Sequence, residues 1–335
     1  MNMLLILFAV FLASFFLTWF VRSFSIRKAI FDVPNERSSH QIPTPRGGGI
    51  AIALTFFFAV CWLAMAGMIS LALAKALVGG GLIIAATGYW DDLRSISAAK
   101  RAVLHFLAAG WALYCLGGFP VLVLGNWQIH WGWFGSVFAA VGIVWLINLY
   151  NFMDGIDGIA GVEAVFVSLV GGCALYLLGA HGLAWVCFFL FAAVLGFLLW
   201  NWPPAKIFLG DVGSGLLGYI FAVIALASAN QQMLPLLFWL VLLAVFICDA
   251  TFTLLHRMKR GERWYSAHRE HVYQRLTQHG VSHQRVTLLV TVVNLAFILP
   301  IFYWIVRQPN FAPWLFLFVA LGFFVVWRQV IAQDK

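Results

Sequence analysis

The chain has 335 residues, of which 63% are hydrophobic and only 10% are charged, and its formal net charge is +8. A soluble domain of this composition would expose far more apolar surface than monomeric proteins do, so a soluble globular fold is excluded. The basic residues lie between apolar runs, where positive charge usually encodes membrane orientation, and we therefore expect no nucleic-acid partner.

About eleven apolar runs are long enough for a helix to cross the hydrocarbon of a bilayer, which needs about 20 residues. The first is interpreted as a retained helix rather than a signal peptide, because no positive region precedes it and no small-residue cleavage site follows it. The runs lie at approximately 3–21, 49–69, 71–89, 102–118, 134–150, 159–178, 183–200, 213–229, 235–255, 286–306 and 313–330. The sequence therefore predicts one all-α, polytopic membrane domain over residues 1–335.

Charge predicts the orientation of this domain. An amino terminus outside and a cytoplasmic carboxyl terminus place all but two of the 20 Lys and Arg residues, Lys75 and Arg307, in or beside cytoplasmic loops. The acidic residues of the loops fall on the same side, so we expect an active site on the cytoplasmic face. The loops expected to form it are approximately 22–46, 90–101, 151–158, 201–212 and 256–285.

The second predicted helix follows Arg46 and three glycines, among them Gly48. In the expected orientation its first N–H groups and the positive end of its dipole face the cytoplasm, where they could cradle a phosphate. Arg46 could add a bidentate contact. The alternative is a flexible glycine hinge.

The third predicted helix ends at Asp91 and Asp92. A carboxylate at this negative end of the dipole costs about 0.3 to 1 kcal/mol unless a cation is near. Consecutive helical residues point about 100° apart, so the two aspartates should have different roles, one facing a cation or nucleophile and one supporting it. The alternative is a solvated helix end steadied by Arg94 and Lys100.

Four oxygen-bearing side chains, Asn148, Asn151, Asp154 and Asp157, follow one another at intervals of three residues where one predicted helix ends and the next begins. Residues three apart share a helical face, and amide and carboxylate oxygens are ligands that Mg²⁺ accepts alongside phosphate. The alternative, in which Asp157 caps the next helix, explains one carboxylate only.

Asp211 precedes the eighth predicted helix, where it could be an N-cap. Because it shares a membrane face with the earlier acidic groups, we expect it in the same site. Asn201, Lys206 and an exposed Phe208 supply an amide, a cation and an aromatic surface suited to a nucleotide diphosphate.

The last long loop is basic and contains His268, Arg269, His271 and Arg275. We expect it to contact pyrophosphate or anionic lipid. A zinc site at the histidine pair and a run of charge that only sets topology are the alternatives.

Ionisable residues also fall inside the predicted helices. Asp249 shares a helical stripe with Thr253 and His256 that leads toward the cytoplasmic face, so it is expected to support the site from behind. Glu163 is expected to make a contact between helices, and His105 to be a hydrogen-bonded histidine between helices.

In this order, the motifs resemble those of the polyprenyl-phosphate N-acetylhexosamine-1-phosphate transferase superfamily, over essentially the whole chain. The resemblance rests on residues 32–40, 43–49, 91–92, 148–158, 208–214 and 268–276. Residues 32–40 look closer to the branch that initiates O-antigen lipid intermediates. The alternative is phospho-N-acetylmuramoyl-pentapeptide transferase, whose branch has a denser histidine triplet and a lysine before its glycine motif.

The resemblance implies transfer of a sugar 1-phosphate from a UDP-N-acetylhexosamine to undecaprenyl phosphate in a bacterial inner membrane, with release of UMP. It implies Mg²⁺, with Mn²⁺ as a substitute, and allows a homodimer. In the implied site, Asn151 and Asp211 hold the metal, and Asp91 or Asp92 serves the nucleophile. Asp154 and Asp157 orient the nucleotide and the pyrophosphate, while Phe208 stacks on uracil and Asn201 contacts the nucleotide. The phosphates or the sugar are bound by His268, Arg269, His271 and Arg275.

Two functions of other classes fit the composition. A transporter of anionic glycoconjugates would place ionisable groups near the bilayer midplane or within reach of both sides, whereas here they gather on one side. A membrane scaffold would not require oxygen ligands at three successive helix junctions.

Overall fold

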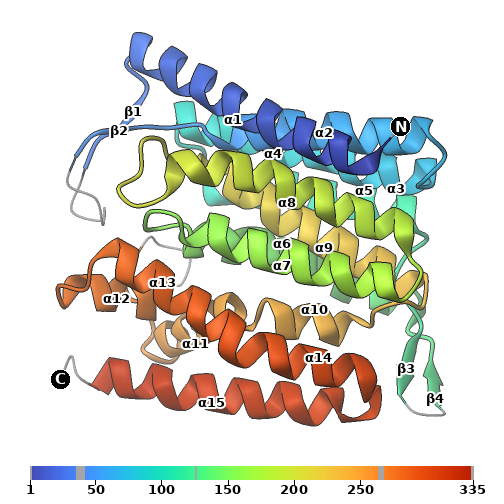
Figure 1. The fold of residues 1–335 in the computed structure, drawn as a ribbon. Coiled ribbons are helices and arrows are strands. Elements are labelled where there is room, and N and C mark those ends of the chain that lie inside the picture. The colour runs from blue at the N-terminus through green and yellow to red at the C-terminus, as the bar shows by residue number, and fades with distance from the viewer. Residues whose placement is uncertain (1, 35–41, 125–126, 263–267, 333–335) are drawn as a thin grey trace.

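The computed structural model describes residues 2–34, 42–124, 127–262 and 268–332, which form a stack of helices running roughly in one direction (Figure 1). The elements of the first half are α1 (Met3–Arg27), β1 (Phe31–Asp32), β2 (Thr44–Pro45), α2 (Gly49–Met65), α3 (Leu71–Lys75), the π-helical η1 (Ala76–Gly80), α4 (Gly81–Leu93), α5 (Ala98–Leu116), β3 (Leu122–Leu124) and β4 (Trp127–Ile129). The strands form two antiparallel pairs, β1 with β2 and β3 with β4.

The second half is helical in its described residues. Its elements are α6 (Gly132–Met153), α7 (Ile159–Leu177), α8 (His181–Asn201), α9 (Gly210–Asn230), α10 (Leu236–Leu242), α11 (Ala244–Lys259), α12 (Val272–Gln278), α13 (His283–Val293), the π-helical η2 (Asn294–Ile298), α14 (Leu299–Arg307), the 3-10 turn η3 (Pro309–Phe311) and α15 (Ala312–Ala332). The prediction of an all-α polytopic membrane protein is confirmed in outline.

Within the described ranges, eight helical segments are long and apolar enough to cross a membrane, and α10 with α11 would make a ninth. The helix α2 is apolar but shorter. Each of the eleven predicted runs is helical over most of its length, but the number of crossings and the orientation stay predictions.

The predicted apolar run over 235–255 is not one continuous helix, because α10 and α11 meet at an angle of 84°. Beyond the bend, the Asp249 carboxylate of α11 accepts the N–H groups of Val272 at 2.9 Å and Tyr273 at 3.5 Å. The bend thus directs α11 toward the start of α12, and Asp249 satisfies N–H groups that a helix start leaves without an intrahelical partner.

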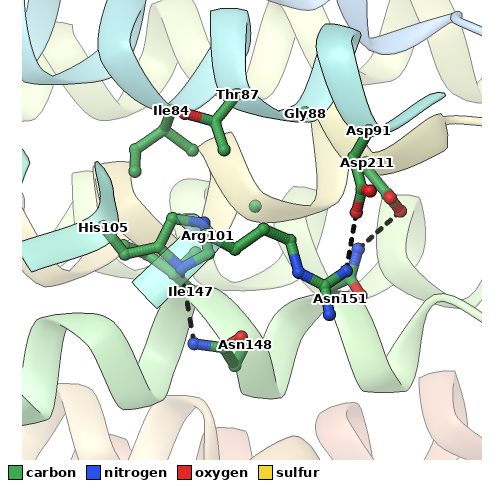
Figure 2. Close-up of a pocket in the computed structure, with 11 residues that line it drawn as sticks. Ile84, Thr87, Gly88, Asp91, Arg101, His105, Ile147, Asn148, Asn151 and Asp211 are labelled. Atoms are coloured by element: carbon green, nitrogen blue, oxygen red, sulfur yellow. Dashed lines mark hydrogen bonds and ion pairs between the residues drawn. The ribbon is translucent and has the colours of Figure 1, made fainter. Parts of the chain in front are cut away.

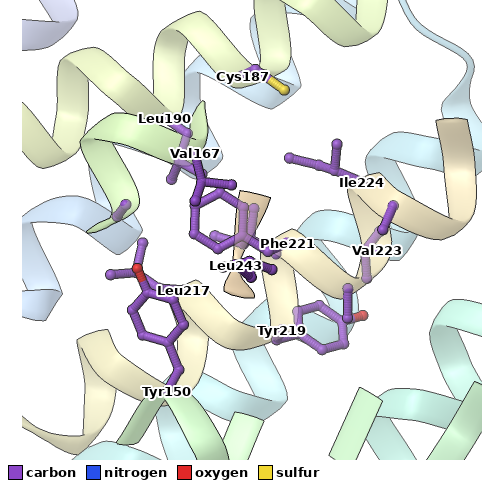
Figure 3. Close-up of a cluster of buried hydrophobic side chains, with 14 of the residues drawn as sticks. Tyr150, Val167, Cys187, Leu190, Leu217, Tyr219, Phe221, Val223, Ile224 and Leu243 are labelled. Carbon is purple, nitrogen blue, oxygen red and sulfur yellow. The ribbon is translucent and has the colours of Figure 1, made fainter. Parts of the chain in front are cut away.

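The centre of the stack is α9, which is buried over nearly its whole length. Its apolar side chains point in all directions, as expected for a helix surrounded by others, and Figure 3 shows Leu217, Tyr219 and Phe221 within this core. The helices α2, α4 and α6 pack against it. By contrast, α1 and α15 expose most of their apolar side chains, which suits a surface covered by lipid.

Candidate active site

The carboxyl end of α4 meets the amino end of α9 in close contact. A Cβ atom on Gly88 would lie 2.5 Å from the carbonyl carbon of Asp211, so only glycine allows this approach. Across the contact, the Asp92 carboxylate accepts the N–H of Asp211 at 3.1 Å. Two acidic motifs that are far apart in the sequence therefore lie side by side.

Asp91 and Asp92 have different partners. Arg46 Nε lies 2.9 Å from Asp92 Oδ1, and its Nη2 lies 3.8 Å from Asp211 Oδ1. Asp91 instead accepts the N–H of Ile96 at 2.8 Å and a hydrogen bond from Arg101 Nη1 at 2.6 Å. The two side chains therefore face different partners, as their spacing on the helix predicted, and their separate roles stay predictions.

The alternative of a solvated helix end steadied by Arg94 and Lys100 is wrong. The cations are Arg46 and Arg101, rather than Arg94 and Lys100. The Asp92 side chain is only 7% exposed, and its Oδ2 atom is buried without a hydrogen-bond partner among the described residues. Because an unpaired buried carboxylate oxygen is costly, this atom is the place where a proton or a cation would be stabilised.

The carboxyl end of α6 completes the cluster. Asn151 donates hydrogen bonds to Asp211 Oδ1 at 2.8 Å and to Ser214 Oγ at 2.9 Å. The structure therefore brings together the two side chains that the resemblance assigns to the metal. No three His, Cys, Asp or Glu side chains gather as a metal-binding group in the described residues, but Mg²⁺ usually takes one or two carboxylates, with water and substrate phosphate completing its shell. The donors present fit that requirement.

A cavity runs along this junction between α4, α5, α6 and α9. Figure 2 shows Asp91, Arg101, Asn151 and Asp211 pointing toward one another at one end of it. At the other end, Asn148 Nδ2 lies 3.5 Å from His105 Nδ1. The expectation of a hydrogen-bonded His105 between helices is confirmed, and its ring also lines the cavity.

Two cavity residues were missed as site residues in the sequence. Arg101 and His105 are four residues apart on α5, so they share a face. Arg101, the first residue of that face, is only nine positions after Asp92, the second residue of the predicted acidic pair. A basic residue and a histidine on one face of the next helix were the signal that could have found them.

Asp154 and Asp157 lie in the turn between α6 and α7. Burial raises the pKa of Asp154 well above its usual value, the charge of Asp211 raises it further, and Arg46 opposes the shift. Asp157 accepts the N–H of Ala205 at 3.0 Å, and its other oxygen lies 3.4 Å from His283 Nδ1. The suggestion that Asp157 caps α7 is wrong, since no side chain caps that helix, and its contact with substrate stays a prediction.

The predicted phosphate cradle at α2 is wrong in its physical basis, because the N–H groups there are not bare. Gly48 N–H donates to the Phe208 carbonyl at 2.9 Å and Gly49 N–H donates to the Leu209 carbonyl at 2.8 Å. A Cβ atom on Gly48 would also overlap the Phe197 ring. These glycines allow α2 to approach the segment before α9, whereas Arg46 does reach the carboxylates.

In the segment 201–208, the polar groups of Asn201 make hydrogen bonds within the protein. Asn201 is 4% exposed, accepts the Gly158 N–H at 3.0 Å and donates to the Ile207 carbonyl at 2.9 Å. Phe208 is half-buried, so its predicted exposure is wrong. Lys206 is exposed, and its ammonium lies 5.4 Å from the centre of the Trp200 ring, outside the carboxylate cluster. Nucleotide contacts of these three residues stay predictions.

The basic loop packs on the end of α6. The Tyr273 hydroxyl donates to the Phe152 carbonyl at 2.7 Å, and the His271 ring stacks on the Phe152 ring with centres 6.4 Å apart. His271 is 3% exposed and lies 3.6 Å from Asp249 Oδ1. Asp249 therefore supports this loop, as its helical stripe predicted.

The charged side chains of this loop are largely paired within the protein. Arg275 Nε donates to the Glu270 carbonyl at 2.9 Å, and Arg257 pairs with the Glu270 carboxylate. Burial and then the charges of His271 and Arg257 lower the pKa of His268 to about 3, so its imidazole is neutral. The Arg269 carbonyl accepts from Gln278 at 2.8 Å. Phosphate or sugar binding by His268, Arg269, His271 and Arg275 stays a prediction.

The sequence is similar to a set of enzymes that act on lipid phosphates. The profile of the family described as "Glycosyl transferase family 4" matches residues 74–229, a range that contains Asp91, Asn151 and Asp211. The decaprenyl-phosphate N-acetylglucosaminephosphotransferase of Mycolicibacterium smegmatis is 30% identical over 313 residues, covering 83% of this chain and 76% of the relative.

Two further relatives cover more of the chain. The probable undecaprenyl-phosphate N-acetylglucosaminyl 1-phosphate transferase of Bacillus subtilis is 26% identical over 329 residues, which is 95% of this chain and 87% of the relative. The undecaprenyl-phosphate alpha-N-acetylglucosaminyl 1-phosphate transferase of Escherichia coli K12 is 28% identical over 310 residues, covering 87% and 82%. The similarity thus extends across both halves of the fold.

Proposed function

The chain belongs to the superfamily of polyprenyl-phosphate N-acetylhexosamine-1-phosphate transferases, and from this premise we propose the reaction that it catalyses. It transfers N-acetylglucosamine 1-phosphate from UDP-N-acetylglucosamine to undecaprenyl phosphate, giving undecaprenyl-diphosphate-N-acetylglucosamine and UMP. The names of the relatives support this transferred group and this acceptor. The product would start a lipid-linked glycan of the O-antigen type.

The observation that carries the proposal is the convergence of Asp91, Asp92, Asn151 and Asp211 around Arg46 and Arg101. In the reaction an oxygen of the lipid phosphate attacks the β-phosphorus, and the bond from that phosphorus to the oxygen of UMP breaks. Both reactants are anions, so catalysis requires cations and alignment rather than covalent chemistry by the protein.

Different residues supply the cations and the alignment. Arg46 and Arg101 offset the charge of the phosphates, while Asn151 and Asp211 would hold Mg²⁺. The metal, when bound, would neutralise charge on the diphosphate and fix its position. We assign Asp92 to the nucleophile, because its free Oδ2 can take a proton from the lipid phosphate, whereas both oxygens of Asp91 are engaged.

We also propose that this site faces the cytoplasm of a bacterial cell across the inner membrane, in a chain with eleven crossings. Arg46 follows β2, and His271 precedes α12; both elements lie at one end of the stack, while the β3–β4 hairpin lies at the other (Figure 1). Positive charge in the loops supports placing the first end inside.

The test is UMP release by the purified protein in detergent. We expect UMP only when UDP-N-acetylglucosamine, undecaprenyl phosphate and Mg²⁺ are all present. UDP-N-acetylmuramoyl-pentapeptide should be a poor donor, and preference for it would favour the peptidoglycan alternative. Absence of UMP with every UDP-sugar, together with uptake of a glycoconjugate into vesicles, would contradict the proposal in favour of a transporter.

A further inference from the structure

The helical segment that carries Asp91 and Asp92 is not α-helical throughout. Between α3 and α4, the five residues of η1 form a π-helical turn. A π turn holds about one residue more than an α turn, so each residue beyond it is turned back by about 100° relative to an uninterrupted α-helix. Position 92 therefore takes the face that position 91 would take in a straight helix.

This rotation decides which carboxylate meets which cation. With the π turn in place, Asp92 reaches Arg46 and Asp91 reaches Arg101. In a straight α-helix of the same length, Asp91 would take the place beside Arg46. Trp90, which is exposed in the structure, would be turned toward Arg101.

The contact between α4 and α9 depends on the same register. Gly88 faces the backbone of Asp211, and a Cβ atom at this position would lie 2.5 Å from it. In a straight helix, Thr87 would occupy the contact, and its Cβ atom would collide with α9. The π turn is therefore a condition for the close approach that assembles the site.

Side chains from two neighbouring helices hold the π turn. The hydroxyl of Tyr219, a core residue of α9 drawn in Figure 3, donates to the Ala76 carbonyl at 2.8 Å. Trp111 Nε1 donates to the Lys75 carbonyl at 2.8 Å. A Cβ atom on Gly80 would overlap the Tyr219 hydroxyl, so glycine leaves the space for this donor. Side chains that reach the hydrogen-bond ladder of a helix are a known cause of such irregular turns.

We propose that Tyr219 is a positioning residue for the transfer reaction: its hydroxyl holds η1 in the π conformation and thereby fixes the register in which Asp91 and Asp92 face the site. The inference rests on the proposed function, because that reaction supplies the readout. Tyr219 and Asp211 lie on the same helix, α9. One helix therefore carries a carboxylate of the site and sets the rotation of two other carboxylates.

The experiment compares the substitution Tyr219→Phe with the same substitution plus deletion of Val78, a half-buried residue of η1. Tyr219→Phe removes only the hydroxyl, so the turn can relax toward an α-helix, and we expect kcat for UMP release to fall by about tenfold to a hundredfold with a smaller change in KM. Deleting Val78 removes the additional residue, so a straight α-helix again presents Asp92 to Arg46, and we expect kcat to recover.

Tyr114→Phe is the matched control, because this tyrosine is 82% exposed on α5, and it should keep the wild-type kcat. Size-exclusion profiles show whether each variant is folded. If Tyr219→Phe does not fold, the deletion of Val78 is tested in the otherwise wild-type chain. A retained kcat then supports the inference, and a large loss of kcat overturns it.

A wild-type kcat in folded Tyr219→Phe, or no recovery in the folded double variant, overturns the inference while the proposed function stands. A wild-type protein that releases no UMP refutes the proposed function instead.

Discussion

Asp91 and Asp92 are neighbours in the chain, yet their partners give them different chemistry. Both oxygens of Asp91 are engaged, by the Ile96 N–H and by Arg101. Asp92 shares one oxygen between Arg46 and the Asp211 N–H, and keeps the other buried and free. A residue with a free buried oxygen can exchange a proton, whereas one that is fully hydrogen-bonded can mainly orient its neighbours.

The assignment of Asp211 to the metal predicts the effect of Asp211→Asn. Loss of one charge should lower Mg²⁺-dependent UMP release by about a hundredfold or more, because the metal and the phosphates lose a fixed counter-charge. Glu262→Gln is the matched control, since Glu262 lies outside the carboxylate cluster and pairs with Arg257 and Arg260. Full activity of folded Asp211→Asn, measured over a Mg²⁺ titration, would reject the metal assignment.

The low pKa of His268 predicts a loss of stability in acid. The pKa is about 3 in the folded chain and ordinarily about 6.5, so the unfolded chain binds the proton first as the pH falls. The stabilisation of the folded chain by the neutral ring is complete above pH 6.5 and is lost progressively as the pH falls from 6.5 to 3. The melting temperature should therefore fall less between pH 7 and pH 5 in His268→Gln than in the wild type. Equal falls would contradict the assignment.

The sequence predicted the acidic residues of the site better than their supporting residues. The signal is clear for Asp91, Asn151 and Asp211, because carboxylates and amides at helix ends need a hydrogen-bond or charge partner wherever they lie. By contrast, the N–H of Gly48 is used by the Phe208 carbonyl, which lies 160 positions away along the chain. No local pattern shows whether a backbone group is already occupied by so distant a segment.

Among the elements, the contact of α4 with α9 determines whether the site is assembled. We expect Gly88→Ala to force these helices apart, because its Cβ atom would meet the backbone of Asp211 rather than a movable side chain. The free energy of unfolding should fall by about 1 to 3 kcal/mol. The rate of UMP release should fall by more than the loss of folded protein explains. Thermal unfolding and UMP release measure the two effects.

Gly110→Ala is the control for this helix contact, since no atom of another helix lies within 4 Å of the position of the added methyl group. It should match or slightly exceed the wild-type stability, because alanine favours a helix. Equal behaviour of Gly88→Ala and Gly110→Ala would show that the contact does not constrain the site.

The elements themselves were predicted well, and their irregularities were not. Apolar runs of suitable length identified the helices, because the bilayer imposes that length. The 84° bend between α10 and α11 and the π turn of η1 have no such signal. The π turn lies where Tyr219, a side chain of another helix, donates a hydrogen bond to the Ala76 carbonyl.

At the scale of the whole molecule, the orientation in the membrane is testable by labelling. In a cysteine-free background, Gln308→Cys, between α14 and α15, should react with an impermeant maleimide in intact cells. Lys100→Cys, at the start of α5, should react only after permeabilisation, because positive charge predicts that end to be inside. The reverse pattern would place the site on the outer face.

In the whole molecule, separate helix ends form one site, which we propose moves a sugar 1-phosphate onto a lipid. The most direct measurement uses UDP-N-acetylglucosamine labelled with ³²P at the β-phosphate, together with undecaprenyl phosphate and Mg²⁺. We expect the label to pass into the organic phase in equal amount with the UMP formed, and we expect Asp211→Asn to lower both by about a hundredfold or more. Label that stays in the aqueous phase, or moves equally well with Asp211→Asn, would contradict this proposal.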